Sequence, residues 1–187
     1  MKRFTIIPAV LSITLFACAA RTIPSADAQE FTAFAVDQTG GGAGTVQITV
    51  NRWSTDDQRQ RLIGILQEKG PEALIDALRD IPSIGTIRTP DSLGYPLHYA
   101  HKEPLPEGGH KIVIATDRPI SFWESVNQPR SIDYPFTLIQ MQIGPEGVGE
   151  GRLLAAARII AHDNIIEVEH YAMQPVVLTQ VRAEDAR

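Results

Sequence analysis

The residues best able to do chemistry in this sequence are gathered between Asp117 and Glu124, which read DRPISFWE. Two acids, an arginine and a serine beside two aromatic rings could form a site on a loop held by a rigid sheet. A structural role is the favoured interpretation, in which Asp117 bonds the turn, Arg118 pairs with an acid and the rings fill the core edge. The ligand-binding candidates are nevertheless Asp117, Arg118, Phe122, Trp123 and His170.

A hydrolase-like enzyme is the alternative use of this loop, with Asp117, Ser121 and Glu124 acting beside a histidine. It requires a histidine within hydrogen-bond reach of Ser121 or of a carboxylate. The Gly-x-Ser-x-Gly and His-Glu-x-x-His motifs are both absent. We therefore assign no catalytic residue, and an enzyme is not the favoured interpretation.

The histidines suggest a metal site only at first sight. His98 and His101 are three residues apart on an expected strand, so their side chains should point to opposite faces. His162 and His170 also face opposite ways, and His110 should lie too far from His101 to share a metal ion. We expect surface histidines with one core-facing His170, and no metal.

Two glycine-rich segments, 40–44 and 144–151, could suggest a phosphate site. Neither leads into a helix, and neither ends in Gly-Lys-Ser/Thr. Hairpin loops are the simpler interpretation, and no cofactor is expected.

The first residues have the pattern of a secretory signal peptide. Basic Lys2 and Arg3 precede an apolar stretch over 4–20, and a small-x-small cleavage site ends at Ala28. A rival site at Cys18 resembles a bacterial lipobox, which would anchor the protein through a lipid. We expect cleavage after Ala28 and an exported protein, periplasmic or secreted, with lipidation as the less favoured outcome.

The expected mature chain is a single domain over 29–187, with 14 basic and 21 acidic residues and a net charge of −7. An acidic domain is a poor candidate for binding nucleic acid or an anionic membrane surface. The only cysteine, Cys18, falls in the expected leader, so no disulfide is predicted. Pro8 and the short apolar run argue against a transmembrane span.

One hairpin over 95–116 is expected to position the loop. Gly108 and Gly109 suit a tight turn, and 111–116, KIVIAT, is typical of a largely buried strand. Residues 95–102 alternate in polarity, as in a half-buried strand.

The rest of the chain is expected to be strands and turns around two short helices. Thr55 and Gln58 fit a capping box, and Gly70-Pro71 separates the two helical patterns. The fold class is therefore α+β, a mainly antiparallel sheet of about eight or nine strands that curls into a barrel or half-barrel, with a two-helix insertion. The further expected elements are strands 31–36, 45–53, 84–88, 136–143, 152–161, 165–172 and 176–181, and helices 56–69 and 72–80.

A two-residue turn at Asp163-Asn164 fixes a register for its hairpin. Residues whose numbers sum to 327 then face each other, which places Arg158 opposite Glu169 and Ile159 opposite Val168. One face of this hairpin should be charged and the other apolar.

The turn sequences Asp117-Arg118-Pro119-Ile120 and Tyr134-Pro135-Phe136 resemble those of certain uncharacterised exported bacterial proteins. The resemblance covers the second half of the chain. It implies no activity, cofactor or site.

Three functions remain as hypotheses. The favoured one is a non-catalytic exported domain that binds a small apolar or amphipathic molecule or an envelope component. A cavity inside the sheet would favour a ligand, and a filled interior would favour a partner protein or a structural role. The others are the hydrolase, and an accessory or inhibitory protein acting through an exposed aromatic patch at Phe122 and Trp123.

Overall fold

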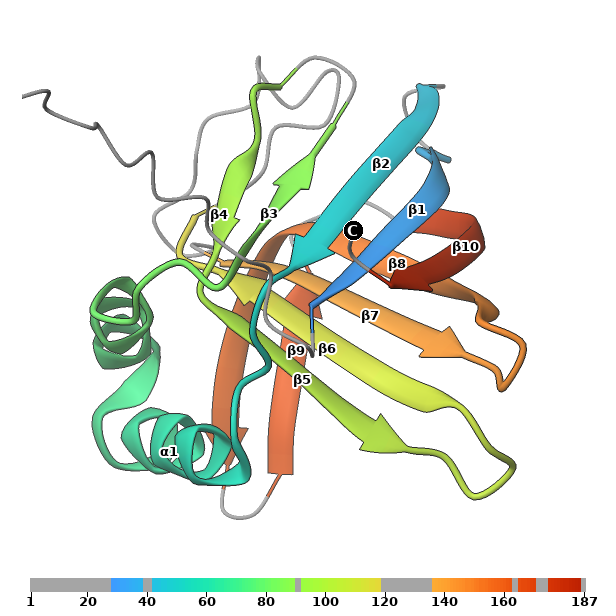
Figure 1. Cartoon of the computed structure of the whole chain (residues 1–187). Helices are drawn as coiled ribbons and strands as arrows, with labels where there is room; N and C mark the ends of the chain where they lie inside the picture. The colour runs from blue at the N-terminus through green and yellow to red at the C-terminus, as the bar shows by residue number, and fades with distance from the viewer. Residues whose placement is uncertain are drawn as a thin grey trace, which may run out of the picture.

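The structure, a computed structural model, describes residues 28–38, 42–89, 92–118, 136–162, 165–170 and 175–185. Within these residues the chain forms ten strands and one helix (Figure 1). The strands are β1 Gln29–Val36, β2 Ala43–Val50, β3 Gly85–Arg88, β4 Tyr95–Leu97, β5 Tyr99–Pro104, β6 His110–Thr116, β7 Phe136–Ile143, β8 Val148–His162, β9 Ile165–His170 and β10 Val176–Asp185, and the helix is α1 Asp56–Arg79.

The strands form one antiparallel sheet that curls into a nearly closed barrel (Figure 1). Their order is β4-β3-β2-β1-β10-β8-β7-β6-β5, and β9 extends the sheet by pairing with the second half of β8. The two end strands of this path, β4 and β5, are consecutive in the chain and are separated by His98 alone. The expected mainly antiparallel fold is confirmed, with ten strands instead of eight or nine.

The seam of the barrel lies at His98, where the chain changes partner strand. β4 pairs with β3, whereas β5 pairs with β6. Leu97 and Ala100 are both fully buried in the same core cluster, although residues three apart on one regular strand face opposite sides. The prediction of an uninterrupted alternating strand over 95–102 is therefore wrong, because the strand breaks at His98. The hairpin of β5 and β6 itself is confirmed.

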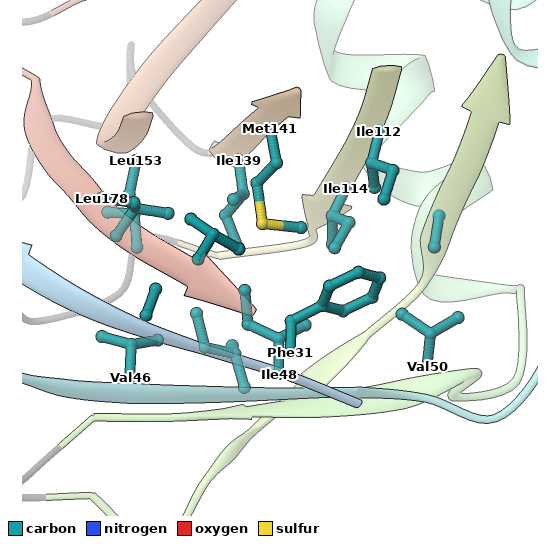
Figure 2. Packing of buried hydrophobic residues seen from close by; sticks show 14 of the residues in the cluster. Phe31, Val46, Ile48, Val50, Ile112, Ile114, Ile139, Met141, Leu153 and Leu178 are labelled. Carbon is teal, nitrogen blue, oxygen red and sulfur yellow. The ribbon is translucent and has the colours of Figure 1, made fainter. Parts of the chain in front are cut away.

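Packed apolar side chains fill the space inside the curled sheet (Figure 2). Every strand except β9 contributes to this cluster. Phe31 and Ile48 on one wall meet Ile114 and Met141 on the other, and all four are at most 1% exposed. Each such buried side chain stabilises the fold by about 1.5–3 kcal/mol.

The helix α1 covers the outer face of β6, β7 and β8. Its apolar stripe of Leu62, Leu66, Leu74 and Leu78 packs against the outward side chains of these strands, in a second core cluster. The expected capping box of Thr55 and Gln58 is confirmed, since each backbone N–H donates to the other residue's side chain, at 3.0 and 3.2 Å.

Two separate helices were predicted here, and the structure has one helical element. It contains a break at Gly70, whose φ of 84° and ψ of −178° are not helical. Glycine reaches positive φ without the steric penalty of a Cβ atom, so the chain changes direction there without leaving the sheet face.

The register predicted for the hairpin of β8 and β9 is confirmed. Arg158 faces Glu169, and Ile159 faces Val168. Ile159 is buried and packs with Val168 in the cluster under α1, so this face is apolar as expected. Asp163 and Asn164 lie outside the described residues.

Two glycines give a matched test of the close packing between β7 and β8. A Cβ on Gly149 would overlap the carbonyl oxygen of Gln142 on β7, whereas a Cβ on Gly64 in α1 would meet no atom within 4 Å. We expect Gly149→Ala to lower the free energy of unfolding by about 1–3 kcal/mol, because a backbone must shift. Gly64→Ala should raise it by about 0.5–1 kcal/mol, because alanine favours a helix. Urea denaturation measures both, and equal effects would contradict the close approach of β7 and β8.

Candidate functional site

The structure places two of the five predicted site residues in a polar network. Asp117 and Arg118 follow β6 directly. Phe122 and Trp123 lie outside the described residues, as do Ser121 and Glu124. His170 is the last residue of β9, opposite Ala157, and its side chain lies outside the description.

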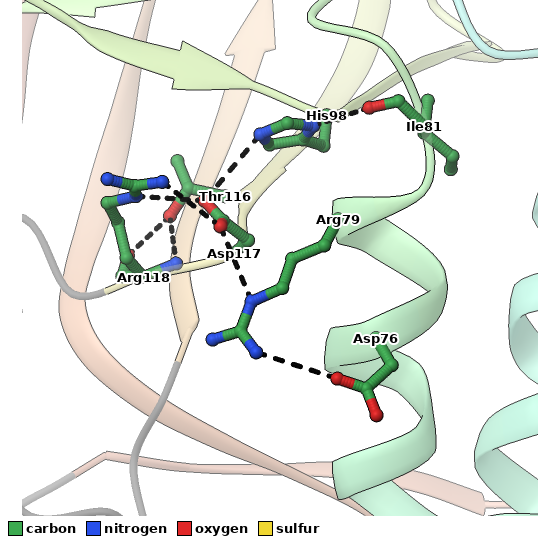
Figure 3. A network of polar contacts seen from close by, with 7 residues as sticks. All are labelled: Asp76, Arg79, Ile81, His98, Thr116, Asp117 and Arg118. Carbon is green, nitrogen blue, oxygen red and sulfur yellow. Dashed lines mark hydrogen bonds and ion pairs between the residues drawn. The ribbon is translucent and has the colours of Figure 1, made fainter.

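The Asp117 carboxylate is the centre of this network (Figure 3). It is buried, and Arg118 donates to both of its oxygens, from Nε at 3.0 Å and from a terminal nitrogen at 3.2 Å. This two-point geometry is the strongest form of an arginine–carboxylate pair. The predicted pairing of Arg118 with an acid is therefore confirmed, and the acid is its own neighbour.

Two residues far away in the sequence complete the network. Arg79, at the end of α1, places Nε 3.6 Å from Asp117 Oδ2, and His98 places Nε2 3.6 Å from Asp117 Oδ1. Arg79 also contacts Asp76 one turn earlier, at 3.5 Å. The end of the helix, the barrel seam and the end of β6 are thus joined at one carboxylate (Figure 3).

A hydrogen bond fixes the tautomer of His98. Its Nδ1 lies 2.7 Å from the carbonyl oxygen of Ile81, and a carbonyl can only accept, so Nδ1 carries a proton. The other ring nitrogen, Nε2, is buried without a hydrogen-bond partner among the described residues.

The electrostatics keep Asp117 ionised. Burial alone raises the pKa of this carboxyl, but the hydrogen bonds and charge of Arg118, with His98 nearby, lower the pKa below its usual value. The hydrogen bond to Asp117 in turn raises the pKa of Arg118. A carboxylate that is held charged by an arginine is a poor general acid or base near neutral pH.

Two buried threonines fix the backbone where the chain leaves β6. The hydroxyls of Thr116 and Thr137 both donate to the carbonyl oxygen of Arg118. Thr137 lies on β7, so the neighbouring strand holds the first residues of the predicted loop in place.

A second histidine network lies at the other end of α1. His101 Nε2 is 2.9 Å from Asp56 Oδ1 in the first turn of the helix. Its Nδ1 is 3.9 Å from Glu103, which pairs with Arg59 at 3.3 Å. The Tyr99 ring stacks on His101 at 6.3 Å. Burial is the main cause that raises the pKa of Tyr99 to about 12.

The prediction of surface histidines is wrong for His98 and His101, which are 9% and 8% exposed. Each contacts one end of the covering helix: His98 contacts Ile81 just after α1, and His101 contacts Asp56 at its start. Nothing local in the sequence indicates that a helix covers these two residues.

These two networks hold the helix to the barrel. Within the described residues, no group of three histidine, cysteine or acidic side chains could hold a metal ion. The hydrolase hypothesis requires a histidine beside the 117–124 loop, and the described histidine there is His98, whose Nε2 lies 3.6 Å from Asp117 Oδ1 without a hydrogen bond. Ser121, its expected nucleophile, lies outside the described residues.

No helix in the described part of the chain is long and apolar enough to cross a membrane.

The Asp117 network can be tested through pH. We expect Asp117→Asn to lower the free energy of unfolding by about 1–3 kcal/mol at neutral pH. Because the folded-state pKa is lowered, the carboxylate stabilises the fold above its unfolded-state pKa of about 3.9. That stability is lost as the pH falls further, through the folded-state pKa.

Urea denaturation at neutral pH and below about pH 3 checks this expectation. The difference between wild type and Asp117→Asn should shrink in acid. Asp76→Asn is the control, because the Asp76 side chain is 78% exposed and should contribute little. A difference that stays constant across the pH range would contradict the charged network.

Comparisons with protein-family models, with curated proteins and with solved structures found no match for this chain. The resemblance to uncharacterised exported bacterial proteins therefore stays a prediction. Any account of the function must come from the residues and their geometry.

Proposed function

We propose that this chain is an exported, non-catalytic binding domain that holds a small amphipathic ligand or another envelope component on the outside of its barrel. Export rests on the predicted signal peptide, with cleavage after Ala28 and a single domain over 29–187. Lipid anchoring through Cys18 is the less favoured form of the same proposal.

The observation that carries this proposal is the filled barrel interior. A barrel of about eight strands has an interior that side chains can just fill, or that can hold one small ligand. Here the large side chains of Phe31, Ile114, Ile139 and Leu153 are fully buried and meet inside the sheet (Figure 2). This packing favours a partner protein or a structural role over storage of a ligand in the interior, so a small ligand would have to bind at an outer surface.

The polar networks support a non-catalytic role. Asp117 is held by two arginines and a histidine, and His101 is held by Asp56. Groups that are engaged in joining elements of the fold contribute to stability, since moving them towards a substrate would break these contacts.

A hydrolase remains the second candidate because of one contact. His98 Nε2, which lacks a hydrogen-bond partner among the described residues, lies beside Asp117 at the start of the predicted loop. In this alternative His98 would act as the base for Ser121. If so, Ser121→Ala should abolish hydrolysis of a panel of simple esters and leave the fold intact. Absence of hydrolysis by the wild type would remove the alternative.

Native mass spectrometry of protein purified from the envelope of its own host tests the binding function. We expect excess mass that is lost on denaturation, because a bound ligand or partner dissociates when the fold is lost. A bare monomer with the mass calculated from Gln29 would contradict the proposal. An acyl increment that survives denaturation would establish the Cys18 anchor.

A further inference from the structure

The predicted signal cleavage makes Gln29 the first residue of the mature chain, and the sheet begins at the same residue. β1 starts at Gln29, which is in register with Val50 of β2 on one side and with Asp185 of β10 on the other. Ala28, directly before the strand, is only 7% exposed. Proteases cut chain that is exposed and unpaired, so we expect the cut after Ala28 to precede the pairing of β1.

The side chain of Gln29 belongs to the face of β1 that points into the barrel. Residues two apart on a strand share a face, and Phe31 and Ala33 lie in the packed interior. Gln29 itself is half-buried at the start of the strand. Within the described part of the chain, no hydrogen bond engages its side-chain amide. This amide is therefore free to react.

A glutamine at a free N-terminus carries a nucleophile and an electrophile in one residue. The uncharged α-amine attacks the side-chain carbonyl carbon Cδ, a C–N bond forms and the bond from Cδ to the amide nitrogen breaks. The amine loses one proton, which leaves with that nitrogen as ammonia, so the step needs no oxidant, reductant or further reactant. The pKa of an α-amino group is about 7.7–8.0, so roughly a tenth of the amine is uncharged at pH 7.

The product, a five-membered lactam, is compatible with the start of a strand. The first residue of a chain has no φ angle, because no residue precedes it, so ring closure leaves the dihedral angles of β1 unrestricted. The lactam keeps one N–H donor and carries no charge. An α-ammonium group would have to lose part of its hydration beside the packed interior, which costs free energy.

We propose that Gln29 is a modification site, at which the mature N-terminus cyclises to pyroglutamate. The inference rests on one part of the proposed function, export with cleavage after Ala28. It is independent of what the domain binds.

The N-terminus of protein freshly extracted from the envelope of its own host tests this inference. We expect an intact mass equal to that calculated from Gln29 minus one molecule of ammonia. The denatured chain should resist Edman degradation until pyroglutamyl peptidase exposes Glu30. An unmodified mass, with glutamine released in the first Edman cycle, would overturn the inference and leave export and cleavage standing.

Gln29→Asn is the matched variant, because it keeps a side-chain amide that is one methylene shorter. Attack on that amide would close a strained four-membered ring, so this variant should keep its full calculated mass and an open N-terminus. Gln47→Asn, an exposed position on β2, is the control and should lose ammonia at Gln29 as the wild type does. Equal loss of ammonia from Gln29→Asn would contradict a lactam at this residue.

The position of the N-terminus separates this inference from the function on which it rests. A chain that begins at an acylated Cys18 would overturn the modification of Gln29 and leave the lipid-anchored form of the proposed function. A chain that retains Met1 would overturn export and the modification together.

Discussion

The barrel depends on one residue, His98, at which a single strand leaves one neighbour and joins another. Its backbone N–H donates to Ala115 on β6, while the N–H of Ile84 donates to Leu97 just before the break. The imidazole leaves the strand and donates to the Ile81 carbonyl beside the helix end. A buried backbone group without a partner costs about 1–3 kcal/mol. The break therefore persists because three hydrogen bonds replace the ladder bonds that it interrupts.

The helix α1 determines which strands are buried on both faces. β6, β7 and β8 lie between the barrel interior and the helix, so a run such as KIVIAT is apolar on both sides. β1, β2 and β10 have no such cover among the described elements, and their outward residues are mostly polar, with Phe34 on β1 as an apolar exception that is 44% exposed. The two histidine networks, at Asp117 and at Asp56, fix the helix over the three strands that need it.

The sequence was sufficient where structure is set by local period and turn chemistry. The capping box at Thr55 and the register of Ile159 with Val168 follow from spacing, and both are confirmed. The break at His98 could not be predicted, because residues 95–102 fit one regular strand, and only the positions of β3 and β6 divide it.

At the Asp117 site, too, contacts between residues far apart in the sequence could not be predicted. Asp117 and its neighbour Arg118 are adjacent in the chain and were predicted together, whereas Arg79 and His98 reach the same carboxylate from other elements.

Native-state hydrogen exchange tests the role of His98 most directly. In wild type the amides of His98 and Ile84 should be protected, and His98→Ala should reduce their protection by about 5- to 150-fold, the equivalent of one lost buried hydrogen bond. The amide of Ile48 on β2 should lose much less. Rapid exchange of the His98 amide in wild type, or an equal loss at all three amides, would contradict the account.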